Sequence, residues 1–262
     1  MLKNTGRLPP ETIPVLEEHL SLLQSNLGDK LIGVYVHGSA AMGGFTPQQS
    51  DLDYLAIVSS ALTPDERKRL SEGFLGLHGT SGFSKGVEMS IVEERFAGRD
   101  FRYPTPYEFH MGSLEQVRHH GEPHQKEHLD PDLASHFTIA RERGVCVYGK
   151  NIDAVFARID RKYFIRSNYE DVRIAPTLIE KDPVYTILNL CRTLYGLKKG
   201  EVLSKVEGAE SYLADRSEYL SQVREALMNY QSGTTGSWDR AELQKFASGM
   251  LREIEEQKPR LP

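Results

Sequence analysis

The chain has 262 residues, 39% hydrophobic and 26% charged, with a formal net charge of −5 at pH 7. This length allows one large domain or two of ordinary size, and no window approaches the roughly 18 consecutive apolar residues of a membrane span. The acidic balance without a basic stripe argues against nucleic acid as a partner, and we expect neither nucleic-acid nor membrane binding.

The N-terminus and the cysteines bear on the compartment. Met1-Leu2-Lys3-Asn4-Thr5 lacks the apolar core of a secretion signal, so we expect a cytoplasmic protein. Cys146 and Cys191 both lie in apolar surroundings. In that compartment such cysteines are typically small buried hydrophobes, and we expect no disulfide.

The N-terminal half alternates helical and strand patterns. Thr63-Pro64-Asp65-Glu66 combines an N-cap, a proline at the first helical position and first-turn acids, which begin a helix. Apolar spacing predicts the other elements. In chain order we expect a helix over about 10–27, strands over 31–36 and 53–58, a helix over 64–77, a strand over 86–92, an irregular loop over 102–106, a helix over 130–143 and a strand over 145–149.

Beyond residue 150 the strand signals disappear. Helical patterns follow over about 151–157, 183–199, 203–214, 217–231 and 238–257. We place a domain boundary at about 150–160, dividing the chain into domains 1–155 and 156–262. The fold class is therefore α+β, with a mixed sheet flanked by helices followed by an all-helical bundle, and a cleft between the two is the expected place for a ligand.

The most informative motif joins two of the predicted strands. An apolar run ends in Gly38-Ser39, and the next strand opens with Ser50-Asp51-Leu52-Asp53. Residues i and i+2 of a strand share a face, so the two carboxylates would project together about 6–7 Å apart. An isolated Asp-x-Asp is more often a solvated turn, but here the flanking strands favour an oxygen-only site for Mg²⁺ and a phosphate.

Glu88 supplies a third carboxylate. It lies in the strand-like run after the helix over 64–77, where it could lie beside the strand that bears Asp51 and Asp53. Taken alone it is equally well an edge-strand glutamate facing water. With the aspartates it completes three carboxylates on adjacent strands.

These motifs resemble the signature of the polymerase-β-like nucleotidyltransferase superfamily. The segment from Asp182-Pro183 to Asn189-Leu190-Cys191-Arg192, together with Leu203-Ser204-Lys205 and Ala226-Leu227-Met228-Asn229-Tyr230, is similar to the helical domain of aminoglycoside adenylyltransferases that modify streptomycin and spectinomycin. The resemblance spans roughly residues 30–232, in both halves and in the same order.

The resemblance implies a role for each matching residue. Asp51, Asp53 and Glu88 would be metal ligands, with Glu88 also the catalytic base, and Asp182 would lie at the drug end of the site. It implies a nucleotide-binding set made of Gly38, Ser39, Ser50, Asp132, Arg192, Lys205 and Tyr230. Taken alone, Arg192 is usually an ion-pair residue, Lys205 a solvated lysine, Tyr230 a core residue and Asp132 a helix N-cap.

Two features depart from a simple match. The histidines at 119, 120, 124 and 128 follow no standard zinc spacing, and we interpret them as a solvated loop. The family's drug-contacting tryptophans are absent from Ser113-Leu114-Glu115 and Asn168-Tyr169-Glu170-Asp171. This loss of stacking area argues against streptomycin as the substrate, although Glu170, Asp171, Glu180 and Asp182 could pair with substrate amines.

The hypothesis is an enzyme, a monomer, that uses Mg²⁺ (two ions) to transfer AMP from ATP to a hydroxyl of a cationic aminoglycoside or aminocyclitol such as spectinomycin or streptomycin, releasing pyrophosphate. The alternatives are a nucleotidyltransferase with another acceptor, protein or small molecule, and a nucleotide-binding regulatory protein. Three intact, mutually repelling carboxylates argue against the regulatory protein.

Overall fold

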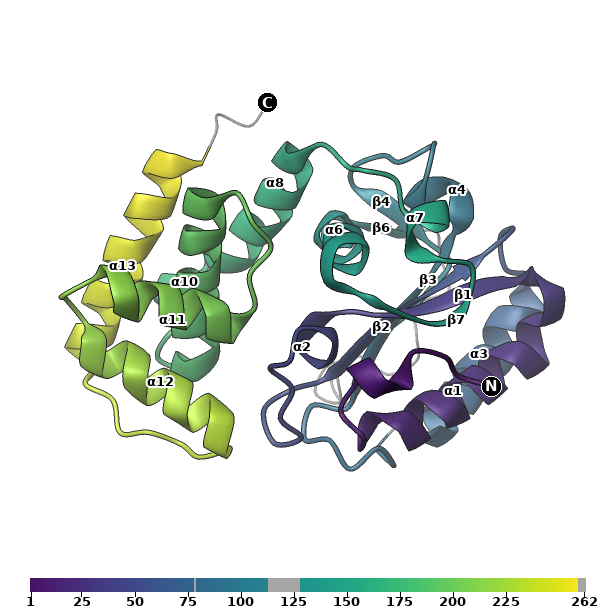
Figure 1. Ribbon diagram of the computed structural model, residues 1–262, viewed down its shortest axis with the longest axis horizontal. Helices are drawn as coiled ribbons and strands as arrows, with labels where there is room; N and C mark the ends of the chain where they lie inside the picture. Colours follow the sequence, from purple (N-terminus) through teal and green to yellow (C-terminus); the bar gives the residue numbers. More distant parts are fainter. Residues whose placement is uncertain (78, 113–127, 259–262) are drawn as a thin grey trace. The chain divides into compact units, whose positions relative to one another are not determined.

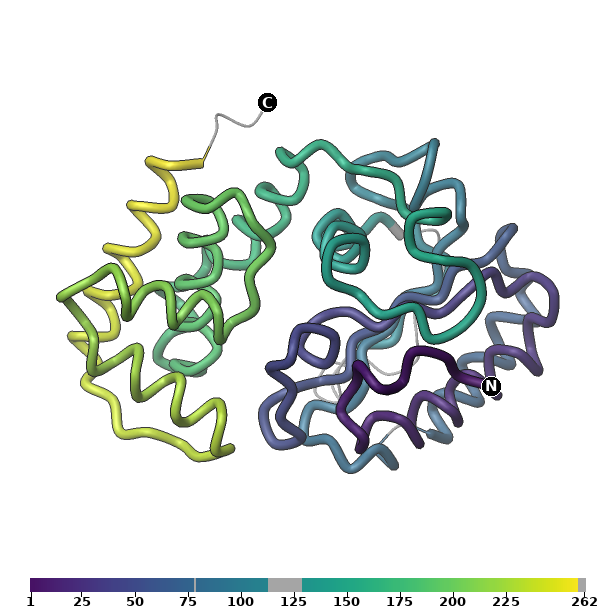
Figure 2. Tube along the Cα trace, in the orientation of Figure 1, coloured from purple at the N-terminus to yellow at the C-terminus, as the bar shows by residue number. Residues whose placement is uncertain are grey.

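The structure, a computed structural model, describes residues 1–77, 79–112 and 128–258 (Figure 1). The chain divides into two compact units, Met1–Ile159 and Asp160–Pro262. The tube in Figure 2 follows the chain through each unit in turn. Among the described residues, every helix is too short or too polar to serve as a membrane span.

A five-stranded mixed sheet forms the centre of the first unit. The strand order is β5-β3-β2-β1-β7, with β2 and β3 parallel and the other neighbours antiparallel. Nearly continuous apolar sequence in β1 and β2 agrees with their place between other strands of the sheet, where both faces are covered. The strands are β1 (Leu31–Val36), β2 (Leu52–Val58), β3 (Val87–Glu93), β5 (Phe109–Met111) and β7 (Val145–Gly149).

Helices cover both faces of this sheet, as expected (Figure 1). On one face α1 (Thr12–Leu27) and α3 (Pro64–Leu77) pack with Val34, Tyr54 and other residues of the same strand parity. On the other face α6 (Leu133–Arg143) packs against Tyr35, Leu55 and Ile57, whose side chains point the opposite way. Short helices complete the unit: α2 (Gly38–Ala41), α4 (Glu94–Ala97), α7 (Ile152–Val155) and the 3-10 turns η1 (Thr5–Arg7) and η2 (Gly28–Lys30).

Two sequence expectations are wrong near residues 102–143. Instead of a wholly irregular loop, 102–106 leads into strand β4 (Thr105–Tyr107), which pairs with β6 (His128–Asp130). Proline is tolerated in such a two-stranded ribbon because one side of each strand needs no donor, and Pro106 lies opposite Leu129. The following helix begins at Leu133 rather than at 130, because Asp130 pairs with Thr105.

The second unit is entirely helical in its described part. The predicted helices appear as α10 (Pro183–Lys199), α11 (Lys205–Asp215), α12 (Leu220–Ser232) and α13 (Arg240–Gln257), and they share one apolar core. Ser204 and Glu207 form a capping box that begins α11. No helical pattern in the sequence predicted α8 (Arg161–Val172) or α9 (Ala175–Leu178). In α8 only Ser167 and Val172 are buried, so the helix lacks an apolar stripe.

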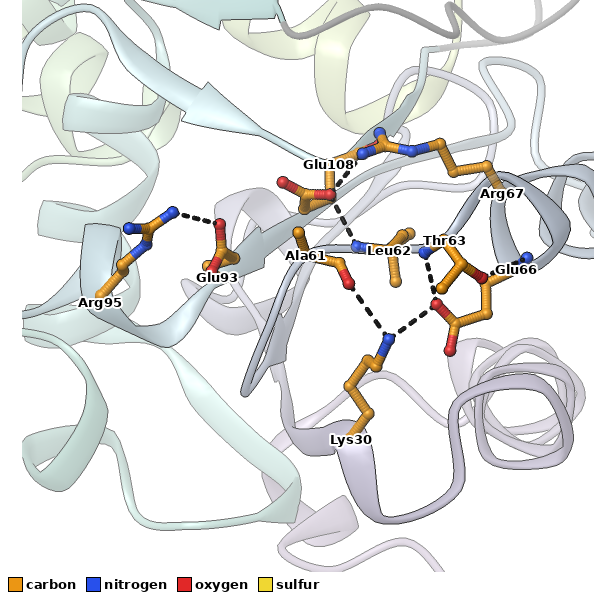
Figure 3. A network of polar contacts seen from close by, with 9 residues as sticks. All are labelled: Lys30, Ala61, Leu62, Thr63, Glu66, Arg67, Glu93, Arg95 and Glu108. Atoms are coloured by element: carbon orange, nitrogen blue, oxygen red, sulfur yellow. Dashed lines mark hydrogen bonds and ion pairs between the residues drawn. The ribbon is translucent and has the colours of Figure 1, made fainter.

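Buried acids of the first unit are held by a polar network (Figure 3). The Glu108 carboxylate accepts hydrogen bonds from the Leu62 amide at 2.8 Å and from Arg67 Nη2 at 2.6 Å. Lys30 pairs with Glu66 at 2.7 Å, and Arg95 with Glu93 at 2.8 Å. The first two contacts tie the start of α3 to Lys30, which precedes β1, and to Glu108, which precedes β5. Glu93 ends β3, whereas Glu88 of the predicted site lies near the start of the same strand.

Removing the Arg67 side chain tests this network. Arg67→Ala leaves the Glu108 charge, whose side chain is 11% exposed, without its guanidinium partner. We expect the free energy of unfolding to fall by about 2–3 kcal/mol, measured by urea denaturation. Lys68→Ala is the matched control, since its pair with Glu72 is 4.0 Å long and exposed, and it should cost less than about 0.5 kcal/mol. Equal effects of both substitutions would contradict the assignment.

Candidate active site

The register of β2 and β3 brings three carboxylates together. Asp53 lies directly opposite Glu88 in the parallel ladder, and Asp51 precedes β2 by one residue. Asp53 shares its strand face with Leu55 and Ile57, so the carboxylates lie on the face that α6 covers further along. One carboxylate oxygen from each of Asp51, Asp53 and Glu88 lies within 4.8 Å of the other two. The predicted convergence is present.

Gly38 shapes the site from the adjoining loop. Its backbone has φ +61°, and a Cβ atom placed there would lie 2.0 Å from Oδ2 of Asp53. The His37 amide also donates to the Asp53 carbonyl at 3.0 Å, so the turn after β1 lies directly against this aspartate. A glycine is therefore required at position 38 for two reasons: the left-handed backbone conformation and the lack of room for a side chain beside the Asp53 carboxylate.

The two serines of the motif differ. Ser50 is buried, and its hydroxyl accepts a hydrogen bond from the Thr46 amide at 3.1 Å, which closes the loop before Asp51. Ser39 lies at the start of α2, and its buried Oγ has no hydrogen-bond partner among the described residues. A buried hydroxyl without a partner is costly, which marks Ser39 Oγ as available to a ligand.

The carboxylates fit Mg²⁺. It prefers oxygen ligands at about 2.1 Å, so two ligands of one ion lie up to about 4.2 Å apart. The observed limit of 4.8 Å is close to that spacing. All three residues are part-buried, where mutual repulsion is less screened than in open solvent, and a cation offsets it.

A histidine pair adjoins the Gly38 turn. His37 and His136 of α6 have ring centroids 4.8 Å apart. Burial, and then the nearby His136, holds the pKa of His37 well below its usual value, so its ring is neutral at pH 7. Asp132, one turn earlier, is exposed at the N-cap position of α6, but its side chain makes no capping hydrogen bond. No sequence pattern indicated a role for either histidine.

In the helical unit, cations and tyrosines gather on three helices. Lys205 Nζ of α11 lies 4.5 Å from the Tyr185 ring centroid of α10 and 5.8 Å from the Tyr230 ring centroid of α12. Arg192 Nη2 lies 3.6 Å from Oδ2 of Asp171 on α8. Gly208 lets α11 approach α10, since a Cβ there would lie 2.4 Å from the Arg192 Cα. Tyr230 is also a core residue, 4% exposed.

The other residues predicted from the sequence are an N-cap residue and several that lie outside the described structure. Asp182 is the N-cap of α10, and its Oδ1 accepts from the Tyr185 amide at 3.1 Å. Histidines 119, 120 and 124, and the segment 113–115, lie outside the described residues, whereas His128 belongs to β6. The sequence motifs did not single out Tyr185, although its i, i+7 spacing from Arg192 places the two side chains on one helix face.

Comparison with known proteins agrees with this architecture. Residues 154–253 match the family model described as "Aminoglycoside adenylyltransferase, C-terminal domain". A spectinomycin 9-adenylyltransferase of Staphylococcus aureus is 28% identical over 78% of both chains. An aminoglycoside (3'') (9) adenylyltransferase of Klebsiella pneumoniae is 26% identical over 82% of this chain and 84% of its own. A crystal structure of spectinomycin adenyltransferase from Enterococcus, with ATP and spectinomycin, superposes with a TM-score of 0.79 at 20% identity, covering 93% of this chain and 99% of that one.

The chain is thus a nucleotidyltransferase with the predicted α+β fold and helical C-terminal unit. Its resemblance to the aminoglycoside adenylyltransferase family, indicated by the motifs of both halves, is confirmed.

Substitution of Gly38 tests the packing against Asp53. Gly38→Ala should displace the Asp53 carboxylate and weaken binding of Mn²⁺, used as a spectroscopic probe for Mg²⁺, by about 10-fold or more, since a misplaced ligand loses coordination geometry. Gly43→Ala is the matched control, because Gly43 has φ +77° with nothing within 4 Å of its added Cβ. Both variants should lose about 1–2 kcal/mol of stability from the left-handed backbone. Equal Mn²⁺ affinity in the two variants would refute a role for Gly38 in placing Asp53.

Proposed function

We propose that this protein transfers AMP from ATP to a hydroxyl of an aminoglycoside or aminocyclitol antibiotic, in a Mg²⁺-dependent reaction that releases pyrophosphate. The observation that carries the proposal is the convergence of Asp51, Asp53 and Glu88 within 4.8 Å on neighbouring strands. The names of the relatives supply the acceptor class.

The three carboxylates have different roles in the proposed transfer reaction. The acceptor oxygen attacks the α-phosphorus of ATP, its proton passes to Glu88, and the bond from the α-phosphorus to the pyrophosphate oxygen breaks. Asp51, Asp53 and Glu88 are the residues that would hold the two Mg²⁺ ions. When bound, Mg²⁺ offsets the charge developing on the attacking and leaving oxygens.

Other residues bind the nucleotide. Gly38 leaves the backbone open to a phosphate, and the Ser39 hydroxyl and the loop closed by Ser50 face its oxygens. From the helical unit Arg192 and Lys205 offset the charge of the triphosphate, and Tyr230 supports Lys205. Asp132, exposed at the N-cap position of α6, contacts the nucleotide in this proposal.

Asp182 is the acid best suited to a cationic acceptor. Glu180 is already paired with Arg240 at 2.7 Å and Gln244 at 2.6 Å, and Glu170 is paired with Arg173. Asp182 is half-buried and uses Oδ1 for its helix cap. Its charge can pair with an acceptor amine at the N-terminus of α10. With no tryptophan in 113–115 or 168–171, the compact aminocyclitol spectinomycin is favoured over streptomycin.

A transfer assay tests the proposal. The purified protein is incubated with α-labelled ATP, Mg²⁺ and a panel that includes spectinomycin and streptomycin, and both pyrophosphate and the labelled acceptor are measured. We expect labelled spectinomycin and equimolar pyrophosphate, lost on chelation of the metal. Labelling of a protein with every drug unmodified would favour the alternative acceptor. Nucleotide binding without transfer to anything would favour a regulatory protein.

Glu88→Gln separates binding from chemistry. The amide keeps the shape of the side chain but cannot take the hydroxyl proton, so transfer should fall by about 10²–10⁴-fold. In Glu88→Gln, binding of a non-hydrolysable ATP analogue should change little. In Asp51→Asn, the Mg²⁺-dependent part of this binding should be lost. Isothermal titration calorimetry and initial rates measure the two quantities. Unchanged turnover in Glu88→Gln would remove Glu88 from the role of base.

A further inference from the structure

Asp171 connects the charged groups of the helical unit. Its Oδ1 accepts the Tyr185 hydroxyl at 3.0 Å, and its Oδ2 lies 3.6 Å from Arg192 Nη2. The ring of the same tyrosine lies 4.5 Å from Lys205 Nζ. A single carboxylate on α8 is thus bonded to α10 twice and, through the Tyr185 ring, reaches the cation of α11.

We propose that Asp171 is a positioning residue, which holds Arg192 directly and Lys205 through Tyr185 in the orientation that binds the phosphates of ATP. The inference rests on the proposed function, in which these two cations bind the triphosphate. Neither the family resemblance nor the transfer chemistry assigned a role to Asp171 beyond a possible pairing with substrate amines, and both of its oxygens are already engaged.

Charge explains why such a residue is needed. Arg192 and Lys205 repel each other, and one carboxylate lowers the net charge of the cluster from +2 to +1. Burial, and then the charge of Asp171, raises the pKa of Tyr185 far above its usual range, so the phenol stays protonated and donates to Asp171. The tyrosine therefore adds no charge, and the ring below Lys205 is fixed at its hydroxyl end.

The Arg192 side chain depends on this contact for its direction. Its Nε is buried and has no hydrogen-bond partner among the described residues. Asp171 is its ion-pair partner in the structure, at 3.6 Å, with Arg192 and Asp171 side chains 26% and 32% exposed. Long side chains lose much rotamer freedom on binding, so a guanidinium held in place beforehand binds phosphate more tightly.

The test compares Asp171→Asn and Tyr185→Phe with wild type. The asparagine keeps its size and can still accept the Tyr185 hydroxyl, but it loses the charge on Arg192. We expect the Kd of a non-hydrolysable ATP analogue with Mg²⁺, and the KM for ATP, to rise about 10-fold, with the acceptor KM unchanged. Tyr185→Phe keeps the ring below Lys205, and it should raise the Kd of the analogue and the KM for ATP by about 3-fold. The double variant should show less than the product of the two effects, because both act through the same carboxylate.

A second tyrosine in the same unit provides a matched control. Lys258 Nζ lies 3.7 Å from the Tyr169 ring centroid, and the Tyr169 hydroxyl donates to Glu255 at 2.7 Å. Glu255→Gln removes the same charge from the same kind of contact and should leave both constants unchanged.

Three results would overturn the inference. If Asp171→Asn binds the analogue as tightly as wild type or more tightly, Asp171 does not position the cations. If only the acceptor KM rises, Asp171 is an acceptor ligand. If only the melting temperature falls, its role is structural. In each case wild-type binding and transfer stand, whereas a wild type that binds no nucleotide would refute the proposed function and this inference with it.

Discussion

Repulsion among Asp51, Asp53 and Glu88 is the constraint on which the catalytic unit depends. Carboxylates this close, within 4.8 Å, disfavour the folded state unless something else holds them. The opposing force comes from β2 and β3, whose buried residues on both faces fix the parallel register that places Asp53 opposite Glu88. A slip of one residue would move apolar side chains to the wrong face, so the register cannot relax to relieve the charge. The site is thus stabilised by hydrophobic burial a few residues away.

The turn after β1 belongs to the same constraint. Gly-Ser at this point is usually explained by the approach of a phosphate, yet the close neighbour of Gly38 is protein, the Asp53 carboxylate. The His37 amide bonds the backbone of the same aspartate. The loop that is proposed to bind phosphate and the residue proposed to bind metal therefore share one packing contact. Their geometries are coupled before any ligand arrives, which lowers the ordering cost of binding.

Local sequence patterns predicted much of the fold and of the candidate site. Apolar runs predicted β1, β2 and β7, and alternation of apolar and polar residues predicted β3. The two-residue period placed Asp51 and Asp53 on one face. The strand of Glu88 was expected beside that of Asp53, but its parallel register with β2 could not be predicted, because the pairing follows from the long crossover through α3. The sequence analysis did not predict α8, which buries little apolar surface, or the strands β4 and β6, which pair with each other outside the five-stranded sheet. Asp171 could not be predicted as the ion-pair partner of Arg192, because the helix that carries it, α8, was itself not predicted.

The helical unit shows the same tension between stability and binding on one helix. α10 carries the apolar core on most of its surface, yet Tyr185, Arg192 and Thr193 interrupt it, and Arg192 Nε and Thr193 Oγ1 are buried without partners among the described residues. Replacement by apolar side chains of similar size would make a better core, since unsatisfied polar atoms each cost about 1–3 kcal/mol. Retaining them is consistent with a helix face shaped for a charged ligand. The Asp171 carboxylate then has a physical reason to lie on the adjacent helix, because it limits that cost while leaving the cluster one positive charge for an anion.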